Sequence, residues 1–101
     1  RSALYFSRSE IPFIRDASAR SQWLGHSTFY KHIGLYVFRR EFLLKYAAMP
    51  ESNLERSEKL EQLRILENGH RIKVGITHYD SVPIDTPDDV VRVIGMLRSN
   101  R

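Results

Sequence analysis

Apolar residues recur with two different periods along this chain, and the shorter period predicts strands. An apolar run at about residues 3–7 is typical of a short strand, and residues 31–39 and 72–76 alternate between apolar and polar positions. A period of two indicates a strand, because successive side chains point to opposite faces of a sheet. We expect three strands, with an irregular connection at about residues 8–29 that is long enough to be functional or mobile.

A helical period predicts three helices in the rest of the chain, of which two are adjacent. The first runs from about Arg40 to Met49 and ends before Pro50, and the second runs from about Ser52 to Glu67. The residues expected to face the core are Phe42, Leu43, Tyr46 and Ala47 in the first helix, and Leu60, Leu63, Ile65 and Leu66 in the second.

Local side-chain signals mark the ends of the second helix. Ser52 and Glu55 have the spacing of a capping box, in which each side chain accepts from the other residue's backbone N–H. Glu55 and Lys59 have the spacing of a favourable ion pair on one helix face. Asn68 and Gly69 are typical of a C-terminal stop. The second helix therefore has a predicted start, an internal pair and a predicted end.

The third helix, from about Pro87 to Arg98, begins with a stronger signal. Thr86 is the expected N-cap, Pro87 suits the first helical position, and Asp89 is the expected capping-box acid. Asp85 lies just outside this cap and has no structural role in it. A carboxylate between a strand end and a helix start suits a hard cation such as Mg²⁺. An aspartate that only stabilises a turn is the alternative.

Strands separated by helices indicate an α/β fold class. Three strands make a thin sheet for helices on two faces, so we expect an incomplete mixed sheet with flanking helices. The chain also begins abruptly, with Arg1 and Ser2 leading directly into the first strand. Together these features predict a portion of a larger domain.

Composition and charge limit the classes of partner. The chain has 101 residues, 42% of them hydrophobic, and a net charge of +4 with twelve arginines among sixteen basic residues. Arginine is suited to carboxylates and phosphates, so an anionic ligand is plausible, and a basic surface is the alternative. Aromatic residues do not interleave with a basic stripe, so we do not expect nucleic acid as a partner.

Two further classes are disfavoured by the sequence. No apolar run approaches the length of a membrane span, so we expect no membrane insertion. The absence of cysteine excludes a disulfide scaffold and a thiolate zinc site, and it fits a reducing compartment. The four histidines show no close ligand spacing, so a zinc site is not expected.

Three groups of polar residues are candidates for a ligand site. His32 and Tyr36 share one face of the second predicted strand, with Gly34 leaving room between them; a polar rim is the alternative. Glu58, Glu61 and Gln62 share a polar helix face that could bind hydroxyl groups, or could be solvated. Arg8 and Arg15 flank a proline-bearing loop and could clamp a carboxylate or phosphate, or could be surface arginines.

Four blocks in register resemble the 3-deoxy-manno-octulosonate (Kdo) cytidylyltransferases, also called CMP-Kdo synthetases. The first two blocks are Ala3-Leu4-Tyr5-Phe6-Ser7-Arg8 with Ile11-Pro12 and Arg15-Asp16, and Lys31-His32-Ile33-Gly34-Leu35-Tyr36 with Arg39-Arg40-Glu41-Phe42-Leu43. The last two are Leu54-Glu55 with Glu58-Lys59-Leu60-Glu61-Gln62-Leu63-Arg64 and Asn68-Gly69, and Asp85-Thr86-Pro87-Asp88-Asp89. The resemblance covers nearly the whole chain.

The resemblance implies a nucleotide-diphospho-sugar-transferase-like (Rossmann-like) fold and a reaction of Kdo with CTP and Mg²⁺ to give CMP-Kdo and pyrophosphate. It implies that Asp85 is the catalytic metal ligand, and that the sugar-acid pocket is lined by Arg8, Arg15, His32, Tyr36, Glu61 and Gln62. It also implies a cytoplasmic homodimer, with residues 40–68 as the candidate contact, and a role in lipopolysaccharide biosynthesis.

The resemblance assigns residues 1–101 to the C-terminal sugar-binding and dimerisation portion of the cytidylyltransferase domain. The CTP-binding half would then be absent, and we expect the chain alone to be inactive. Two alternatives stay open: a cytidylyltransferase for another acidic sugar, and a non-catalytic binding or dimerisation module.

Overall fold

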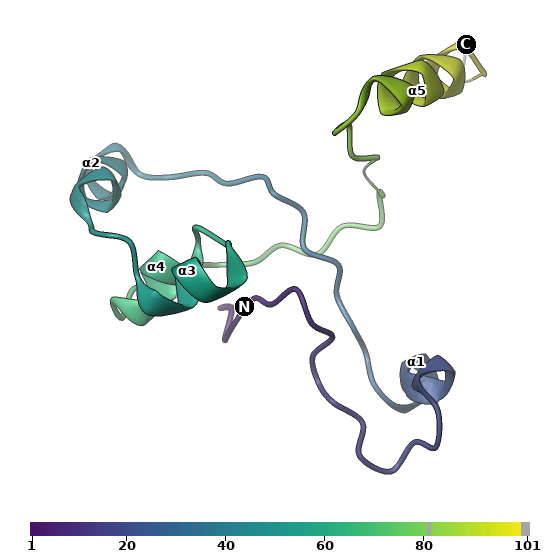
Figure 1. Ribbon diagram of the computed structural model, residues 1–101. Helices are drawn as coiled ribbons and strands as arrows, with labels where there is room; N and C mark the ends of the chain where they lie inside the picture. Colours follow the sequence, from purple (N-terminus) through teal and green to yellow (C-terminus); the bar gives the residue numbers. More distant parts are fainter. Residues whose placement is uncertain (81, 100–101) are drawn as a thin grey trace.

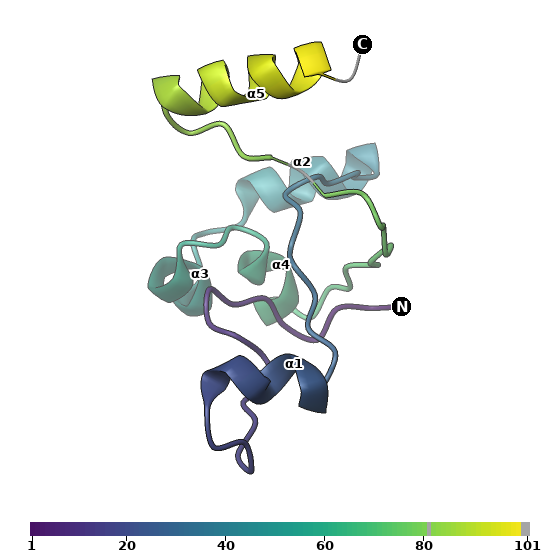
Figure 2. The same ribbon diagram turned by 90° about the vertical axis from the view of Figure 1, so that its right-hand side faces the viewer.

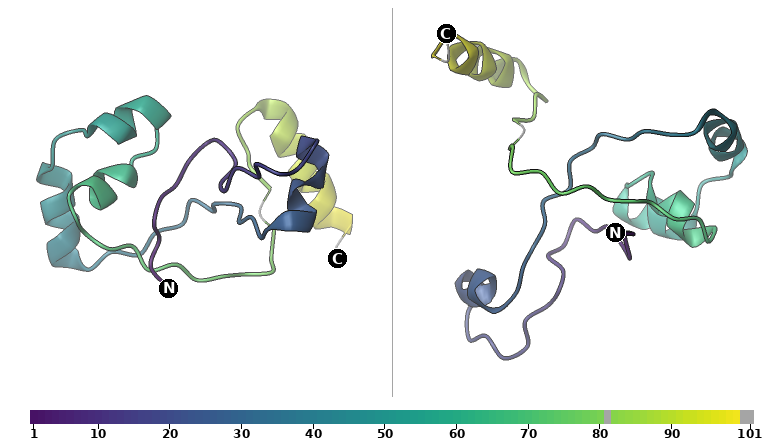
Figure 3. Two further views of the ribbon diagram at one scale, coloured as in Figure 1. Left: turned by 90° about the horizontal axis from the view of Figure 1, so that it is seen from below. Right: turned by 180° about the vertical axis from the view of Figure 1, so that it is seen from behind.

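The computed structural model describes residues 1–80 and 82–99, and its regular elements are all helical (Figure 1). They are η1 (Arg20–Gln22), α1 (Trp23–His26), α2 (Arg40–Ala48), α3 (Asn53–Glu58), α4 (Leu63–Glu67) and α5 (Pro87–Ser99). Long extended segments join the α2–α4 group to α1 and α5 (Figure 3). None of the described helices is long and apolar enough to cross a membrane.

The core of the described chain lies where α3 packs against α4 (Figures 1 and 2). Leu63 is fully buried and Ile65 is 3% exposed, whereas Leu4 and Val37 are each 96% exposed. The radius of gyration is 17.2 Å, against about 13 Å for a compact chain of this length. The residues therefore do not gather around one hydrophobic core.

The three predicted strands of an incomplete sheet are not confirmed by the described residues. In the described residues the only strand-like pairing is an isolated antiparallel bridge between Ser2 and Lys73. Its hydrogen bonds run from the N–H of Ala3 to the oxygen of Ile72 and from the N–H of Val74 to the oxygen of Arg1, both at 2.8 Å.

Apart from that bridge, residues 3–7, 31–39 and 72–76 form neither helix nor paired strand, and residues 33–35 make a tight turn. Side-chain alternation favours an extended backbone, but a sheet also needs neighbouring strands that accept and donate its ladder hydrogen bonds. The predicted mixed sheet with flanking helices is therefore not formed by these residues.

The second predicted helix is divided into α3 and α4, so its prediction as one continuous helix is wrong. Lys59 follows α3 in the left-handed region, with φ 56° and ψ 43°, which stops a right-handed helix. Glu55 does not pair with Lys59 and instead binds Arg64. The predicted ends are confirmed: Ser52 and Glu55 form a full capping box, and Gly69 follows α4 with φ 80°.

Helix α2 agrees with its prediction to within one residue, but its expected buried face is not buried. Leu43 is 46% exposed, Ala47 is exposed, and Phe42 and Tyr46 are only partly covered. The rings of Phe42 and Tyr46 pack on Phe38, at centroid distances of 6.2 and 5.7 Å. This aromatic contact covers one edge of α2, so the rest of its apolar face stays accessible in the described chain.

Helix α5 also agrees with its prediction, and it lies apart from the other helices (Figures 1 and 2). The N–H of Asp89 donates to the Thr86 hydroxyl at 3.2 Å, and the N–H of Thr86 donates to the Asp89 carboxylate at 3.1 Å. The backbone N–H of Asp85 donates to the same carboxylate oxygen at 3.1 Å. The capping box predicted at this helix start is confirmed.

Candidate functional site

A pocket of about 350 Å³ lies between residues 32–38 and the turn that joins α3 to α4. Its lining residues are His32, Tyr36, Phe38, Tyr46, Lys59, Leu60, Glu61, Gln62 and Ile65. The volume is at the lower end of small-molecule sites, and the lining combines aromatic faces with a few polar groups. Four of the seven predicted site residues, from two different segments, meet here.

Gln62 lines this pocket and carries a buried hydrogen-bond donor that has no partner among the described residues. The residue is only 6% exposed, and its Nε2 has no hydrogen-bond partner among the described residues. A buried amide without a partner costs about 1–3 kcal/mol, so such a group is retained where something else can accept its hydrogen bonds. A ligand oxygen in the pocket would supply that acceptor.

The chain bends between His32 and Tyr36. In an extended strand their Cα atoms would be about 13 Å apart. Here a tight turn around Gly34, closed by a hydrogen bond of 2.9 Å from the Leu35 N–H to the Ile33 oxygen, folds the segment. The His32 Nε2 and the Tyr36 hydroxyl form a hydrogen bond, with ring centroids 5.7 Å apart.

Both rings are neutral at pH 7. Burial lowers the pKa of His32 below its ordinary value, with the Phe6 ring 5.0 Å from the imidazole. Burial also raises the pKa of Tyr36, and the nearby Tyr46 and Glu61 raise it further. These two side chains therefore offer the pocket neutral hydrogen-bonding groups.

Arg8 holds the turn at the edge of the pocket. Its Nε donates to the Glu58 main-chain oxygen at 2.5 Å and its Nη2 donates to the Lys59 oxygen at 2.8 Å. The Glu58 carboxylate accepts from the Ser7 hydroxyl at 3.0 Å and from the Arg8 N–H at 3.4 Å. Glu58, a candidate for ligand binding, therefore anchors residues 7–8 instead of lining the pocket.

Arg15 is not brought to the pocket. It is exposed, and it has no hydrogen bond or ion pair within residues 1–80 and 82–99. The two-arginine clamp predicted from Arg8 and Arg15 is therefore not assembled in this structure.

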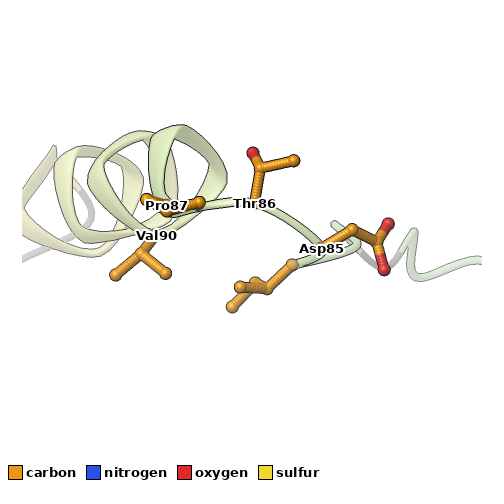
Figure 4. Close-up of a pocket in the computed structure, with 5 residues that line it drawn as sticks. Asp85, Thr86, Pro87 and Val90 are labelled. Atoms are coloured by element: carbon orange, nitrogen blue, oxygen red, sulfur yellow. The ribbon is translucent and has the colours of Figure 1, made fainter.

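Asp85 lies on a separate, more open hollow formed by its own neighbours Ile84, Thr86, Pro87 and Val90 (Figure 4). Its carboxylate points away from α5 and makes no hydrogen bond or ion pair with any described residue. Mg²⁺ is often held by one or two carboxylates together with substrate phosphates, so Asp85 fits as a single ligand. The described part of the chain holds no group of three His, Asp or Glu residues that could bind a metal.

Sequence reasoning missed Tyr46 as a lining residue of this pocket, and it missed the Glu55–Arg64 pair that lies beside Tyr46. Arg64 donates from Nε and Nη2 to the Glu55 carboxylate, at 2.8 and 2.6 Å, and its guanidinium lies 5.0 Å from the centroid of the Tyr46 ring. Tyr46 was expected only as a core residue. Glu55 and Arg64 lie nine positions apart, and a pair at that spacing leaves no periodic signal in the sequence. Only the folded turn brings these side chains together.

Comparison with known proteins identifies the family. A family model described as "Cytidylyltransferase" matches residues 1–72, which include every residue that lines the pocket. The chain belongs to the cytidylyltransferase family. Membership indicates a nucleotide-sugar-transferase-like fold for the family domain. The match ends at residue 72, so Asp85 lies outside it.

Several relatives of this cytidylyltransferase chain are named 3-deoxy-manno-octulosonate cytidylyltransferase. The chain is 51% identical to that of Solibacter usitatus over 98 residues, which is 97% of this chain and 36% of the relative. It is 57% identical to that of Bacteroides thetaiotaomicron over 88 residues, which is 87% of this chain and 35% of the relative. It is 51% identical to that of Geobacter sulfurreducens over 100 residues, which is 95% of this chain and 40% of the relative. The chain thus spans little more than a third of these relatives.

Proposed function

We propose that this chain is the sugar-binding portion of a 3-deoxy-manno-octulosonate cytidylyltransferase. The observation that carries the proposal is the buried, unpartnered Nε2 of Gln62 in a pocket that also contains His32, Tyr36 and Glu61. A polyhydroxylated sugar acid offers many oxygen acceptors for such a donor. The names of the relatives point to the same substrate.

The reaction of the complete enzyme transfers a cytidylyl group. The anomeric hydroxyl oxygen of Kdo forms a bond to the α-phosphorus of CTP, and the bond between that phosphorus and the oxygen leading to the β-phosphate breaks. The electron pair leaves with pyrophosphate, and the hydroxyl proton is released. Catalysis of this kind depends mainly on positioning and on neutralising charge.

The residues of this chain would bind and orient the sugar. Glu61, Gln62, Tyr36 and His32 are proposed to recognise hydroxyl groups, since neutral donors and a carboxylate discriminate hydroxyl patterns by hydrogen bonding. Arg15 is the proposed partner of the sugar carboxylate. Arg8 could assist through Nη1, which its contacts with Glu58 and Lys59 leave available.

Asp85 is proposed to provide one carboxylate ligand for Mg²⁺ in the complete enzyme. A bound Mg²⁺ would supply positive charge to neutralise the phosphates of CTP. The free carboxylate of Asp85 at the start of α5 supports this assignment, and the other ligands would come from outside this chain.

The remaining features of the proposal concern the whole protein. Residues 3–7, 31–39 and 72–76 would pair with strands from outside this chain to complete a mixed sheet flanked by helices. Their apolar patterning supports this pairing, and none of them is helical here. The complete protein would be a cytoplasmic homodimer in lipopolysaccharide biosynthesis. The exposed apolar face of α2 supports residues 40–68 as a contact region.

The proposal is tested by measuring pyrophosphate release and sugar-nucleotide formation by the complete enzyme with CTP, Mg²⁺ and a panel of acidic sugars. Kdo should give the highest kcat/KM, and the 101-residue chain alone should give no product. If a sialic acid gives the highest kcat/KM, the substrate is that sugar and not Kdo. If no acidic sugar is turned over and the protein dimerises cleanly, the result favours a non-catalytic module. Product formed by the 101-residue chain alone would refute its assignment as an incomplete part.

A further inference from the structure

Tyr46 joins α2 to the turn that carries the candidate ligand-binding residues. Its hydroxyl donates to the main-chain oxygen of Glu61 at 3.2 Å, and its ring packs on Phe38 with an interplanar angle of 22°. Burial raises the pKa of Tyr46, so the hydroxyl is protonated at neutral pH and can act as this donor. Tyr46 thus contacts the main chain directly before Gln62.

The Tyr46 ring is fixed in turn by the Arg64 guanidinium. Arg64 lies 5.0 Å from the ring centroid and is bound through two hydrogen bonds to Glu55, which is only 5% exposed. Its Nη1 also donates to the Met49 oxygen at 3.2 Å, directly after α2. A planar cation fixed in this way restricts the ring from one side, while Phe38 packs on it as well.

The turn needs such support because its backbone departs from the helical path. Lys59 has a left-handed conformation, and the Arg8 guanidinium holds the Glu58 and Lys59 oxygens on the side nearest α3. The Glu61 oxygen is held by Tyr46 on the side nearest α4. The Glu61 side chain leaves the main chain between these two points, and Gln62 follows directly after the second.

We propose that Tyr46 is a positioning residue of the sugar pocket, which fixes the main chain at Glu61 and so directs Glu61 and Gln62 toward the sugar. This inference rests on the proposed function. Arg64 and Glu55 act through Tyr46 by holding its ring. The role differs from simple core packing, because it depends on the hydroxyl and not only on the ring.

The test is Tyr46→Phe in the complete enzyme, since this change removes the hydroxyl and keeps the ring. The KM for the acidic sugar should rise about fivefold, as expected for one lost neutral hydrogen bond. The KM for CTP and kcat should stay within about twofold, which separates loss of sugar positioning from general damage. Tyr79→Phe is the matched control, because Tyr79 is 88% exposed, and it should change neither KM.

A second arm repeats Tyr46→Phe in a Glu61→Ala/Gln62→Ala background. If Tyr46 acts through these two side chains, its loss should add less than about twofold to the sugar KM there. A full fivefold increase in that background, or an unchanged sugar KM in the single variant, would overturn the inference. Should Tyr46→Phe fail to fold, Arg64→Lys tests the step before it, because it keeps the charge and loses the planar contact that holds the Tyr46 ring. An unchanged sugar KM in Arg64→Lys would then overturn the inference.

The same measurements separate this inference from the proposed function. If Gln62→Ala raises the sugar KM and Tyr46→Phe does not, only the role of Tyr46 is wrong. If Gln62→Ala leaves the KM unchanged for every acidic sugar in the panel, the proposed function is wrong as well.

Discussion

Arg64 binds the Glu55 carboxylate through two hydrogen bonds, of 2.8 Å from Nε and 2.6 Å from Nη2, and so joins α4 to the start of α3. The same carboxylate accepts from the Ser52 N–H at 3.1 Å. Glu55 therefore serves both as the capping acid of α3 and as the anchor of Arg64. The geometry of the pocket depends on this pair, because Arg64 holds the Tyr46 ring.

We expect Glu55→Gln to destabilise the complete enzyme by about 2 kcal/mol, less than for a fully buried ion pair because Arg64 is partly exposed. The hydrogen bonds from Arg64 lower the pKa of Glu55 below its ordinary value of 4.5. The unfolded state therefore takes up the proton first as the pH falls. The stabilisation is fully present above about pH 4.5 and is lost as the pH falls through the lower pKa of the folded state.

Urea unfolding at several pH values between about 3 and 7 would measure this effect. The difference in stability between wild type and Glu55→Gln should shrink toward the acidic end. Glu41→Gln, at the exposed start of α2, is the control. A difference that stays constant over this pH range would show that the ionised carboxylate is not the stabilising group.

Lys59→Gly should stabilise the protein, because Lys59 has a φ of 56° that glycine adopts without the steric cost of a Cβ atom. The gain should be about 1 kcal/mol, or about 2 °C in Tm for a protein of the family's length. Lys59→Ala keeps the strain and is the matched control. Equal Tm values for the two variants would mean that the left-handed turn is not maintained in the complete enzyme.

Thr86→Ala should destabilise α5 by about 1 kcal/mol, because the N–H of Asp89 loses the hydroxyl that accepts its hydrogen bond. Thermal unfolding or hydrogen exchange over residues 87–91 would measure the loss. Asp88→Ala changes a neighbouring acid that has no partner in the capping box, and it should have a smaller effect. The reverse order would contradict the cap assignment.

Asp85→Asn should lower kcat/KM of the complete enzyme by at least about 100-fold if Asp85 is a metal ligand, since even outer-shell partners of a metal contribute up to that factor. The Tm should be unchanged, because the Asp85 carboxylate supports no described contact. A control is Asp88→Asn on the same helix end. Activity of Asp85→Asn at the wild-type level and the same Mg²⁺ concentration would rule out the ligand role.

The parts of the fold that were predicted correctly are those with local causes. The caps at Thr86 and Ser52, the extent of α2 and the stop at Gly69 each depend on residues within a few positions. The strands were predicted from an apolar run and from alternation, and neither pattern provides the neighbouring chain that a sheet requires.

The break at Lys59 could not be read from the sequence, because it depends on Arg8, which is distant in the chain. Likewise, the leucine stripe predicted one continuous helix, while the structure buries Leu63 and Ile65 on a shorter one. Tertiary hydrogen bonds here override local helix preference.

The candidate site was predicted in part for a similar reason. His32 and Tyr36 were predicted to lie together on one face of a strand. They do lie together, but their segment contains a turn at Gly34 and is not a strand. Glu61 and Gln62 joined them through the resemblance to a family, since their spacing alone also fits a solvated helix face. The binding roles of all seven candidate residues stay predictions. Arg8, Arg15 and Asp85 do not line this pocket.

The most direct measurement is the KM for Kdo of the complete enzyme at saturating CTP, compared between wild type and Gln62→Ala. Gln22→Ala is the control, since Gln22 lies in the exposed η1. The account predicts an increase of about tenfold or more for Gln62→Ala, because a buried donor to the sugar is lost, and less than about twofold for Gln22→Ala. A KM for Gln62→Ala within twofold of wild type would contradict the proposal that this pocket binds the sugar.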